Sequence, residues 1–139
     1  MMGGFLVDSN VLLDVLTEDP TWFEWSSGTL RSCAERHILA INPIIYAEIS
    51  VRFVQVEELE QALTGNPLER LPLPWEAAFL AGKCFTQYKR RGGTRPSTLP
   101  DFFIGAHAAV AGLRLLTRDA KRYHTYFPGL EVIAPDSSE

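Results

Sequence analysis

The sequence predicts an α/β fold in which a parallel sheet is covered by helices on both faces. Short apolar runs typical of strands alternate along the chain with segments of helical period, as in parallel sheets connected by helices. The strand segments are almost entirely apolar, which is expected for strands buried on both faces. At 139 residues the chain suits one domain, which we expect to span residues 1–139 with only its last few residues disordered.

Five apolar segments are candidates for the strands. Four are strong, with the sequences GFLV, ILAI, LRLLT and LEVIA at residues 4–7, 38–41, 113–117 and 130–134. The fifth, ERLPL at residues 69–73, is weaker because Pro72 cannot donate a backbone hydrogen bond. We therefore expect it at an edge of the sheet or at a strand end.

Cap and turn residues delimit the helices between these strands. Ser9 or Asn10 is expected to cap the first helix, which runs to about Thr17. The other expected helices open at Pro20 and Thr21, run from Pro43 through Phe53, cover residues 56–63 and 75–91, and extend from Pro100 and Asp101 to Gly112.

Composition and charge narrow the class of protein. Apolar residues make up 46% of the chain and charged residues 22%, which is ordinary for a globular domain. No apolar run approaches the roughly 18 residues of a membrane span, and no basic region of a signal peptide precedes the first strand, so we expect a cytoplasmic protein without membrane association.

Cys33 and Cys84 lack metal-ligand spacing, which favours reduced thiols and leaves a disulfide open.

Four acidic residues fall near the carboxyl ends of strands, where parallel sheets bind ligands. Asp8 ends the first strand, Asp119 follows the fourth, Asp101 opens the helix before the fourth, and Glu48 lies in the helix after the second. Four carboxylates within a few ångströms would repel one another. A divalent cation such as Mg²⁺ or Mn²⁺, which prefers oxygen ligands, removes that conflict. The pattern therefore predicts a metal site.

Each acid also has a purely structural interpretation. Asp8, Asp101 and Asp119 are each suited to cap a helix, which is worth about 1 kcal/mol. Glu48 and Arg52 stand at i,i+4 spacing and are suited to pair on one helix face. Singly, each acid fits either interpretation. Together, independent caps and pairs give no reason for four acids to converge on one sheet edge.

Four stretches of the chain carry a family resemblance: FLVDSNVLLDVL, PIIYAEI, LPDFFIGAHA and LRLLTRDAKRYHTYFPGLEVIAP. They resemble the PIN-domain ribonucleases, and in particular the VapC-type toxins of bacterial toxin–antitoxin pairs. The likeness covers residues 5 to 135, in the family's order and spacing. It implies a PIN-like three-layer α/β/α domain with a parallel sheet of about five strands, and an endoribonuclease that depends on Mg²⁺ or Mn²⁺.

The resemblance also implies roles for individual residues. The four acids match the family's acidic tetrad, with Asp8 and Asp101 as first choices for direct metal ligands. Asn10 would support the first acid, and Thr117 would place a hydroxyl next to the fourth. The implied partners are an RNA substrate, a small antitoxin protein and a second copy of the chain in a homodimer.

Basic residues cluster beside the expected site although the net charge is −4. Without the four site acids the formal charge of the chain would be zero. Two clusters are candidates for holding the phosphates that flank the cut bond: Lys89, Arg90, Arg91 and Arg95 in one loop, and Arg118, Lys121 and Arg122 beside Asp119. For the first cluster, a solvated helix end is an equal alternative.

Other polar and aromatic residues receive structural interpretations. Asp14 is expected to be a solvated charge, and His107 a packed or surface helix residue. Tyr123, His124 and Tyr126 are expected to form a surface aromatic cluster.

Two rival functions fit parts of the pattern. A phosphatase of the haloacid-dehalogenase type would use Asp8 as its nucleophile, but that chemistry wants an acid two residues later, where Asn10 stands. A catalytically silent PIN-like module that binds RNA or protein would keep the fold and need no metal. The four acids argue against the second rival.

Overall fold

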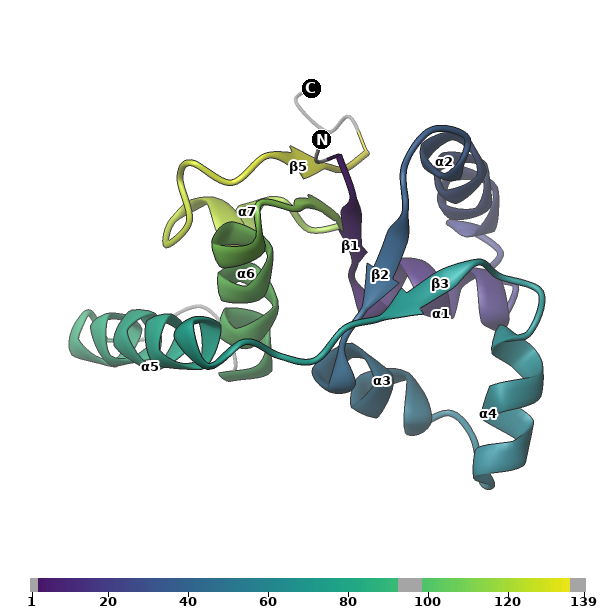
Figure 1. Cartoon of the computed structure of the whole chain (residues 1–139), viewed down its shortest axis with the longest axis horizontal. Helices are drawn as coiled ribbons and strands as arrows, with labels where there is room; N and C mark the ends of the chain where they lie inside the picture. The colour runs from purple at the N-terminus through teal and green to yellow at the C-terminus, as the bar shows by residue number, and fades with distance from the viewer. Residues whose placement is uncertain (1–2, 93–98, 136–139) are drawn as a thin grey trace.

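The computed structural model describes residues 3–92 and 99–135, and it confirms the α/β fold (Figure 1). All four strand pairings are parallel, and they join five strands in the order β3-β2-β1-β4-β5. The strands are β1 (Phe5–Val7), β2 (Leu39–Ile41), β3 (Leu68–Arg70), β4 (Arg114–Leu116) and β5 (Val132–Ile133). The weaker strand segment does lie at an edge, and Pro72 falls just outside it.

Seven helices are present in the described part of the chain. They are α1 (Ser9–Leu16), α2 (Phe23–Ala34), α3 (Pro43–Ser50), α4 (Val56–Leu63), α5 (Trp75–Arg90), α6 (Leu99–Ala111) and α7 (Lys121–His124). The expected end of α3 at Phe53 is wrong. The backbone N–H groups of Arg52 and Phe53 donate to carbonyls three residues back, which closes the helix with a tight turn.

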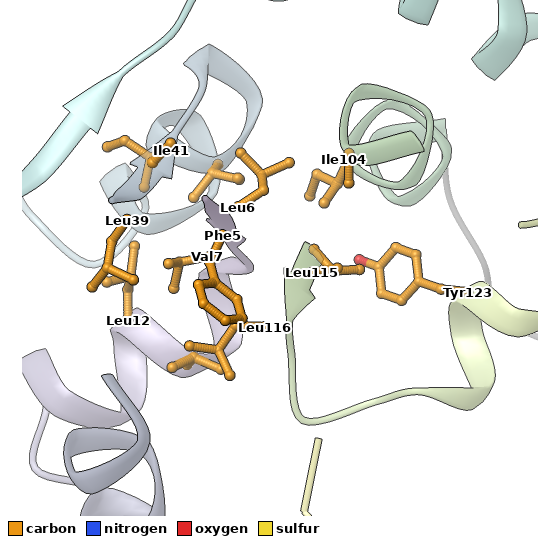
Figure 2. Packing of buried hydrophobic residues seen from close by; sticks show 14 of the residues in the cluster. Phe5, Leu6, Val7, Leu12, Leu39, Ile41, Ile104, Leu115, Leu116 and Tyr123 are labelled. Atoms are coloured by element: carbon orange, nitrogen blue, oxygen red, sulfur yellow. The ribbon is translucent and has the colours of Figure 1, made fainter. Parts of the chain in front are cut away.

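The two faces of the sheet carry different helices. In Figure 2, Leu6 of β1 points toward Ile104 of α6, whereas Val7 points toward Leu12 of α1 on the opposite face. This follows from the alternation of side chains along a strand. All four of these side chains are at most 2% exposed, so the central strand is buried on both faces.

The order of the strands defines where a site can form. From β1 the chain winds outward to β2 and β3, and then returns to place β4 on the other side of β1. Asp8, Asn42 and Thr117 are the residues that directly follow β1, β2 and β4. Three adjacent parallel strands therefore deliver three polar side chains to the same edge, at the point where the direction of winding reverses.

Two further expectations concern cysteines and membranes. Cys33 and Cys84 are both free thiols, which settles the possibility of a disulfide that the sequence left open. Within the described residues, the helices are too short or too polar to cross a bilayer. The expected disorder of the chain end falls on residues 136–139, which lie outside the described residues.

Gly105 allows α6 to pack closely against Phe127. A Cβ atom added at Gly105 would lie 2.5 Å from Cε2 of that ring, which is buried. We predict that Gly105→Ala lowers the free energy of unfolding by about 1–3 kcal/mol, because overpacking outweighs the helix propensity of alanine. Urea denaturation would measure the change.

Gly82 on α5 provides the matched control. It is exposed, and nothing lies within 4 Å of an added Cβ. Gly82→Ala should raise the free energy of unfolding by up to about 1 kcal/mol. Equal effects of the two substitutions would contradict the packing argument.

Candidate functional site

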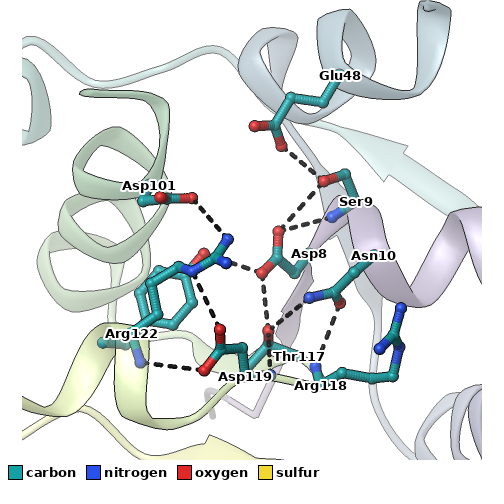
Figure 3. Close-up of polar contacts among 10 residues, drawn as sticks. Asp8, Ser9, Asn10, Glu48, Asp101, Thr117, Arg118, Asp119 and Arg122 are labelled. Carbon is teal, nitrogen blue, oxygen red and sulfur yellow. Dashed lines mark hydrogen bonds and ion pairs between the residues drawn. The ribbon is translucent and has the colours of Figure 1, made fainter. Parts of the chain in front are cut away.

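Asp8 stands at the centre of the polar network at the carboxyl edge of the sheet (Figure 3). Its side chain is 3% exposed, and both of its oxygens accept hydrogen bonds. Oδ1 accepts from the backbone N–H of Ser9 at 2.7 Å. Oδ2 accepts from the hydroxyls of Thr117 at 2.8 Å and Tyr123 at 2.9 Å. The carboxylate is therefore fixed in orientation by three different segments of the chain.

Thr117 and Asn10 form the support behind Asp8. The Thr117 hydroxyl, which donates to Asp8, also accepts from the Asn10 amide at 3.3 Å and from the backbone N–H of Asp119 at 3.1 Å. The Asn10 carbonyl oxygen accepts from the backbone N–H of Arg118 at 3.2 Å. Thr117 therefore contacts Asp8 directly and the backbone of Asp119, whereas Asn10 is linked to Asp8 through Thr117.

Burial raises the pKa of the Asp8 carboxyl above its ordinary value, and the hydrogen bonds from Thr117, Tyr123 and Ser9 oppose that rise. The negative charge of Asp101 raises the pKa further. Removal from solvent is therefore the largest influence on this carboxyl, and the neighbouring negative charge adds to it.

Tyr123 corrects an expectation from the sequence. It is fully buried rather than part of a surface aromatic cluster, and its hydroxyl is committed to Asp8. Burial, together with the neighbouring Asp8, raises the pKa of the Tyr123 hydroxyl well above its usual range, so it stays protonated and acts as a donor.

Glu48 joins the network through Ser9. The Ser9 hydroxyl donates to Oε1 of Glu48 at 2.6 Å and lies 3.5 Å from Oδ1 of Asp8. Glu48 is half-buried, and this burial raises the pKa of its carboxyl. Its hydrogen bond is therefore to the first helix of the site rather than along its own helix to Arg52.

Asp101 and Asp119 are bridged by a cation from the chain itself. The Arg122 guanidinium lies 3.3 Å from Oδ1 of Asp101 and 3.2 Å from Oδ2 of Asp119. Figure 3 shows it reaching between these two carboxylates on the side that faces Asp8. Arg122, which the sequence offers as a phosphate contact, makes two ion pairs with acids of the site in this structure.

The four acids are of the right chemical type to bind a divalent cation, but they do not lie close enough together to hold one in this structure. All four supply carboxylate oxygens at one sheet edge, which suits Mg²⁺ or Mn²⁺. Among the described residues, however, no group of three or more His, Cys, Asp or Glu side chains is gathered closely enough to hold an ion. The expectation of one compact carboxylate cluster is therefore not met. The physical reason that the structure offers is the guanidinium of Arg122 between two of the four acids.

Some of the acids also make the helix-capping contacts that the sequence offers as their structural roles. Asp8 does cap α1 through the N–H of Ser9, in place of the expected Ser9 or Asn10 cap. Asp119 accepts from the N–H of Arg122 at the start of α7. Asp101 lies in the first turn of α6, which begins two residues earlier at Leu99, so it is not the residue that precedes the helix.

Arg118, Lys121 and Arg91 are further basic candidates within the described part of the chain. Arg118 donates to Asp14 at 2.7 Å, and Asp14 is 2% exposed, so the expectation of a solvated Asp14 is wrong. Lys121 is exposed. Arg91 lies over the ring of Tyr126, 5.6 Å from its centroid. Arg95 lies outside the described residues.

A second polar contact ties together the helices that carry Glu48 and Asp101. Asn42 caps α3 by accepting from the N–H of Ile45 at 2.9 Å, which leaves its amide to donate to Nδ1 of His107 at 2.9 Å. His107 lies on α6 and is 1% exposed. Sequence reasoning missed Asn42, although its place between a strand and Pro43 is a typical cap signal.

The sequence and the fold of the chain are similar to those of known proteins. A model of the PIN domain family matches residues 5–128. No curated protein matches the sequence. Among solved structures, the chain is similar to VapBC2 from Rickettsia felis bound to a DNA fragment from their promoter. The TM-score is 0.74 and the identity 19%, and the match covers 94% of this chain and 98% of the other.

Two further structures show the same similarity of fold. For VapBC-1 from nontypeable Haemophilus influenzae the TM-score is 0.72 at 18% identity, with 94% and 97% of the two chains covered. For DNA-bound VapBC from Salmonella typhimurium the TM-score is 0.66 at 22% identity, with 96% and 98% covered.

The pairing of Arg118 with buried Asp14 can be tested by removing the arginine. Arg118→Ala leaves the Asp14 carboxylate with the hydroxyl of Ser26 at 2.6 Å and no cation beside it. We expect a loss of about 2 kcal/mol in the free energy of unfolding. The exposed Lys121→Ala should cost less than about 0.5 kcal/mol. Arg118→Ala as mild as Lys121→Ala would contradict a structural role for Arg118.

His107 should make stability depend on pH. Burial lowers the pKa of His107, and a proton on Nδ1 would face the donating amide of Asn42. The unfolded histidine takes up a proton below about pH 6.5, and the folded one only at lower pH. Wild-type protein should therefore lose stability relative to His107→Gln as pH falls from about 6.5 through the lowered pKa, by at most about 1.4 kcal/mol per pH unit. Urea denaturation at several pH values would measure it, and a constant difference would contradict it.

Proposed function

This chain belongs to the PIN-domain family, and on that premise we propose that it is an endoribonuclease that hydrolyses RNA phosphodiester bonds with Mg²⁺ or Mn²⁺, as the toxin of a toxin–antitoxin pair. The observation that supports the proposal is that Asp8, Glu48, Asp101 and Asp119 all lie at one edge of the sheet (Figure 3). A phosphatase that uses Asp8 as its nucleophile loses its support, because the family match is to the PIN domain.

The four acids are the proposed ligands of the cation, with Asp8 and Asp101 binding directly and Glu48 and Asp119 completing the set. Both direct ligands are at most 7% exposed, so water screens their charges little. A divalent cation held there would activate a water molecule and neutralise charge on the phosphodiester.

The neighbouring residues act by holding these acids in place. Thr117 and Tyr123 together occupy Oδ2 of Asp8, and Ser9 sets the distance between Asp8 and Glu48. A carboxylate held by three donors loses little orientational freedom when it binds a ligand, which is the basis of preorganised sites.

For the RNA, the proposed phosphate contacts are the basic residues around the acids. Lys121 is exposed one residue before Arg122, and Arg91 is exposed at the end of α5. Arg118 and Arg122 are held in ion pairs with Asp14 and with the site acids. The charge that this structure leaves exposed beside Asp119 is therefore that of Lys121.

For partners, we propose a small antitoxin protein and a second copy of the chain. The support comes from the similarity of fold to VapBC complexes, from the similarity to a member of the VapBC family of toxin-antitoxin systems from Mycobacterium tuberculosis, and from apolar side chains at the surface. Trp75 and Phe79 lie one turn apart on α5 and are 88% and 69% exposed. Exposed apolar surface of this kind marks sites of protein contact. A cytoplasmic location is part of the same proposal.

A catalytically silent module that binds RNA or protein is the second candidate. The observation in its favour is the pair of ion pairs from Arg122 to Asp101 and Asp119, because a chain that supplies its own cation needs none from solution.

Cleavage of a labelled single-stranded RNA distinguishes the two candidates. With Mn²⁺ or Mg²⁺ we expect cleavage that EDTA abolishes, and Asp101→Asn should reduce the rate by about a hundredfold or more because several kcal/mol of charge stabilisation are lost. Glu57→Gln removes an exposed carboxylate on α4 and is the matched control. Circular dichroism would establish that each variant is folded.

The outcomes of this assay separate the readings. Cleavage that persists in EDTA, or in Asp101→Asn at the wild-type rate, would exclude the metal-dependent mechanism. A folded wild-type protein that cleaves no RNA with either ion, but still binds it, would favour the silent module.

A further inference from the structure

We propose that Arg122 is the built-in counter-cation of the acidic site, and that its guanidinium must leave Asp101 and Asp119 before a divalent cation can bind there. Arg122 would thus weaken cation binding while stabilising the metal-free protein. The inference rests on the proposed function, because it needs these two carboxylates to be cation ligands.

The geometry places one cation on two proposed ligands at once. Nη1 of Arg122 lies 3.3 Å from Asp101 and Nε lies 3.2 Å from Asp119. The Asp101 side chain is 9% exposed, so this ion pair is shielded from water on one side. A guanidinium with two charge-assisted contacts is a strong competitor for carboxylate oxygens.

Both cations cannot occupy the same pair of carboxylates without repelling each other. The guanidinium also lies on the side of the two carboxylates that faces Asp8, where a shared ion would need room (Figure 3). An ion bound by Asp8, Asp101 and Asp119 therefore requires the Arg122 side chain to turn away.

The exposure of the Arg122 side chain gives it room to turn away from the acids. The Arg122 side chain is 35% exposed, so it has a path to solvent. The next residue, Tyr123, is buried and fixed to Asp8 by its hydroxyl. α7 therefore stays anchored while the arginine rotates, and the support of Asp8 is kept in both states.

Titration of the purified full chain with Mn²⁺, followed by electron paramagnetic resonance of the free ion, tests the competition directly. We expect Arg122→Gln to bind Mn²⁺ about fivefold more tightly than wild type, or better, because two ion pairs no longer have to be broken. Arg36→Gln, the same substitution at an exposed position between α2 and β2, should change the affinity by less than about twofold.

Thermal unfolding gives an independent readout. Without metal, Arg122→Gln should melt at a lower temperature than wild type, because Asp101 and Asp119 each lose an ion pair. Saturating Mn²⁺ should then raise its melting temperature by more than it raises that of wild type. If metal-free Arg122→Gln does not fold, Arg122→Lys replaces it. Lysine keeps the charge but only as a point charge, so Arg122→Lys should bind Mn²⁺ more tightly than wild type.

Each outcome bears on a different claim. Equal or weaker Mn²⁺ binding in the Arg122 variants, with binding abolished in Asp101→Asn, would overturn the counter-cation role and leave the proposed metal site standing. Mn²⁺ binding that is absent in wild type and in Arg122→Gln, or unchanged in Asp101→Asn, would overturn both.

Discussion

The burial of the Asp8 carboxylate at the end of the central strand is the constraint on which the rest of the site depends. A buried carboxylate is costly unless its oxygens find donors. Here the donors come from the start of α1, from the end of β4 and from α7, which lies 115 residues later in the chain. Satisfying Asp8 therefore brings together segments that local sequence preferences would not join. The supports for this one anion also position the neighbouring acids.

The remaining charges are arranged around this anion. Glu48 is connected to it through Ser9, and Asp101 and Asp119 share the guanidinium of Arg122. Two of the arginines near Asp119 are thus held in ion pairs within the protein. Arg118 pairs with Asp14, and Arg122 pairs with acids of the site. The ion pairs of Arg122 partly neutralise the negatively charged edge of the sheet, and they thereby stabilise the folded protein. A fold that binds a divalent cation from solution has to balance stability without the ion against affinity for it.

The sequence was sufficient for the fold, because apolar periodicity located the strands, but it predicted a compact cluster of acids that the described residues do not form. Apolar runs located the strands, the family resemblance alone gave the role of Thr117, and the sequence placed Asp8 at the carboxyl end of a strand, where parallel sheets bind ligands. It was insufficient for contacts made by long side chains between elements. Asp14 looked solvated on its own helix, and its burial depends on Arg118 and Ser26 arriving from elsewhere. Tyr123 and Arg122 are adjacent, yet one is buried under Asp8 and the other bridges two acids, a difference set by tertiary packing alone.

The most direct test of the account is a crystal structure of the chain soaked in Mn²⁺, with anomalous scattering used to locate the ion. The account predicts an anomalous peak in contact with Asp8 and Asp101, with the Arg122 side chain turned away from Asp101. A crystal soaked at saturating Mn²⁺ that shows no anomalous peak at this edge, with Arg122 still bridging Asp101 and Asp119, would contradict it.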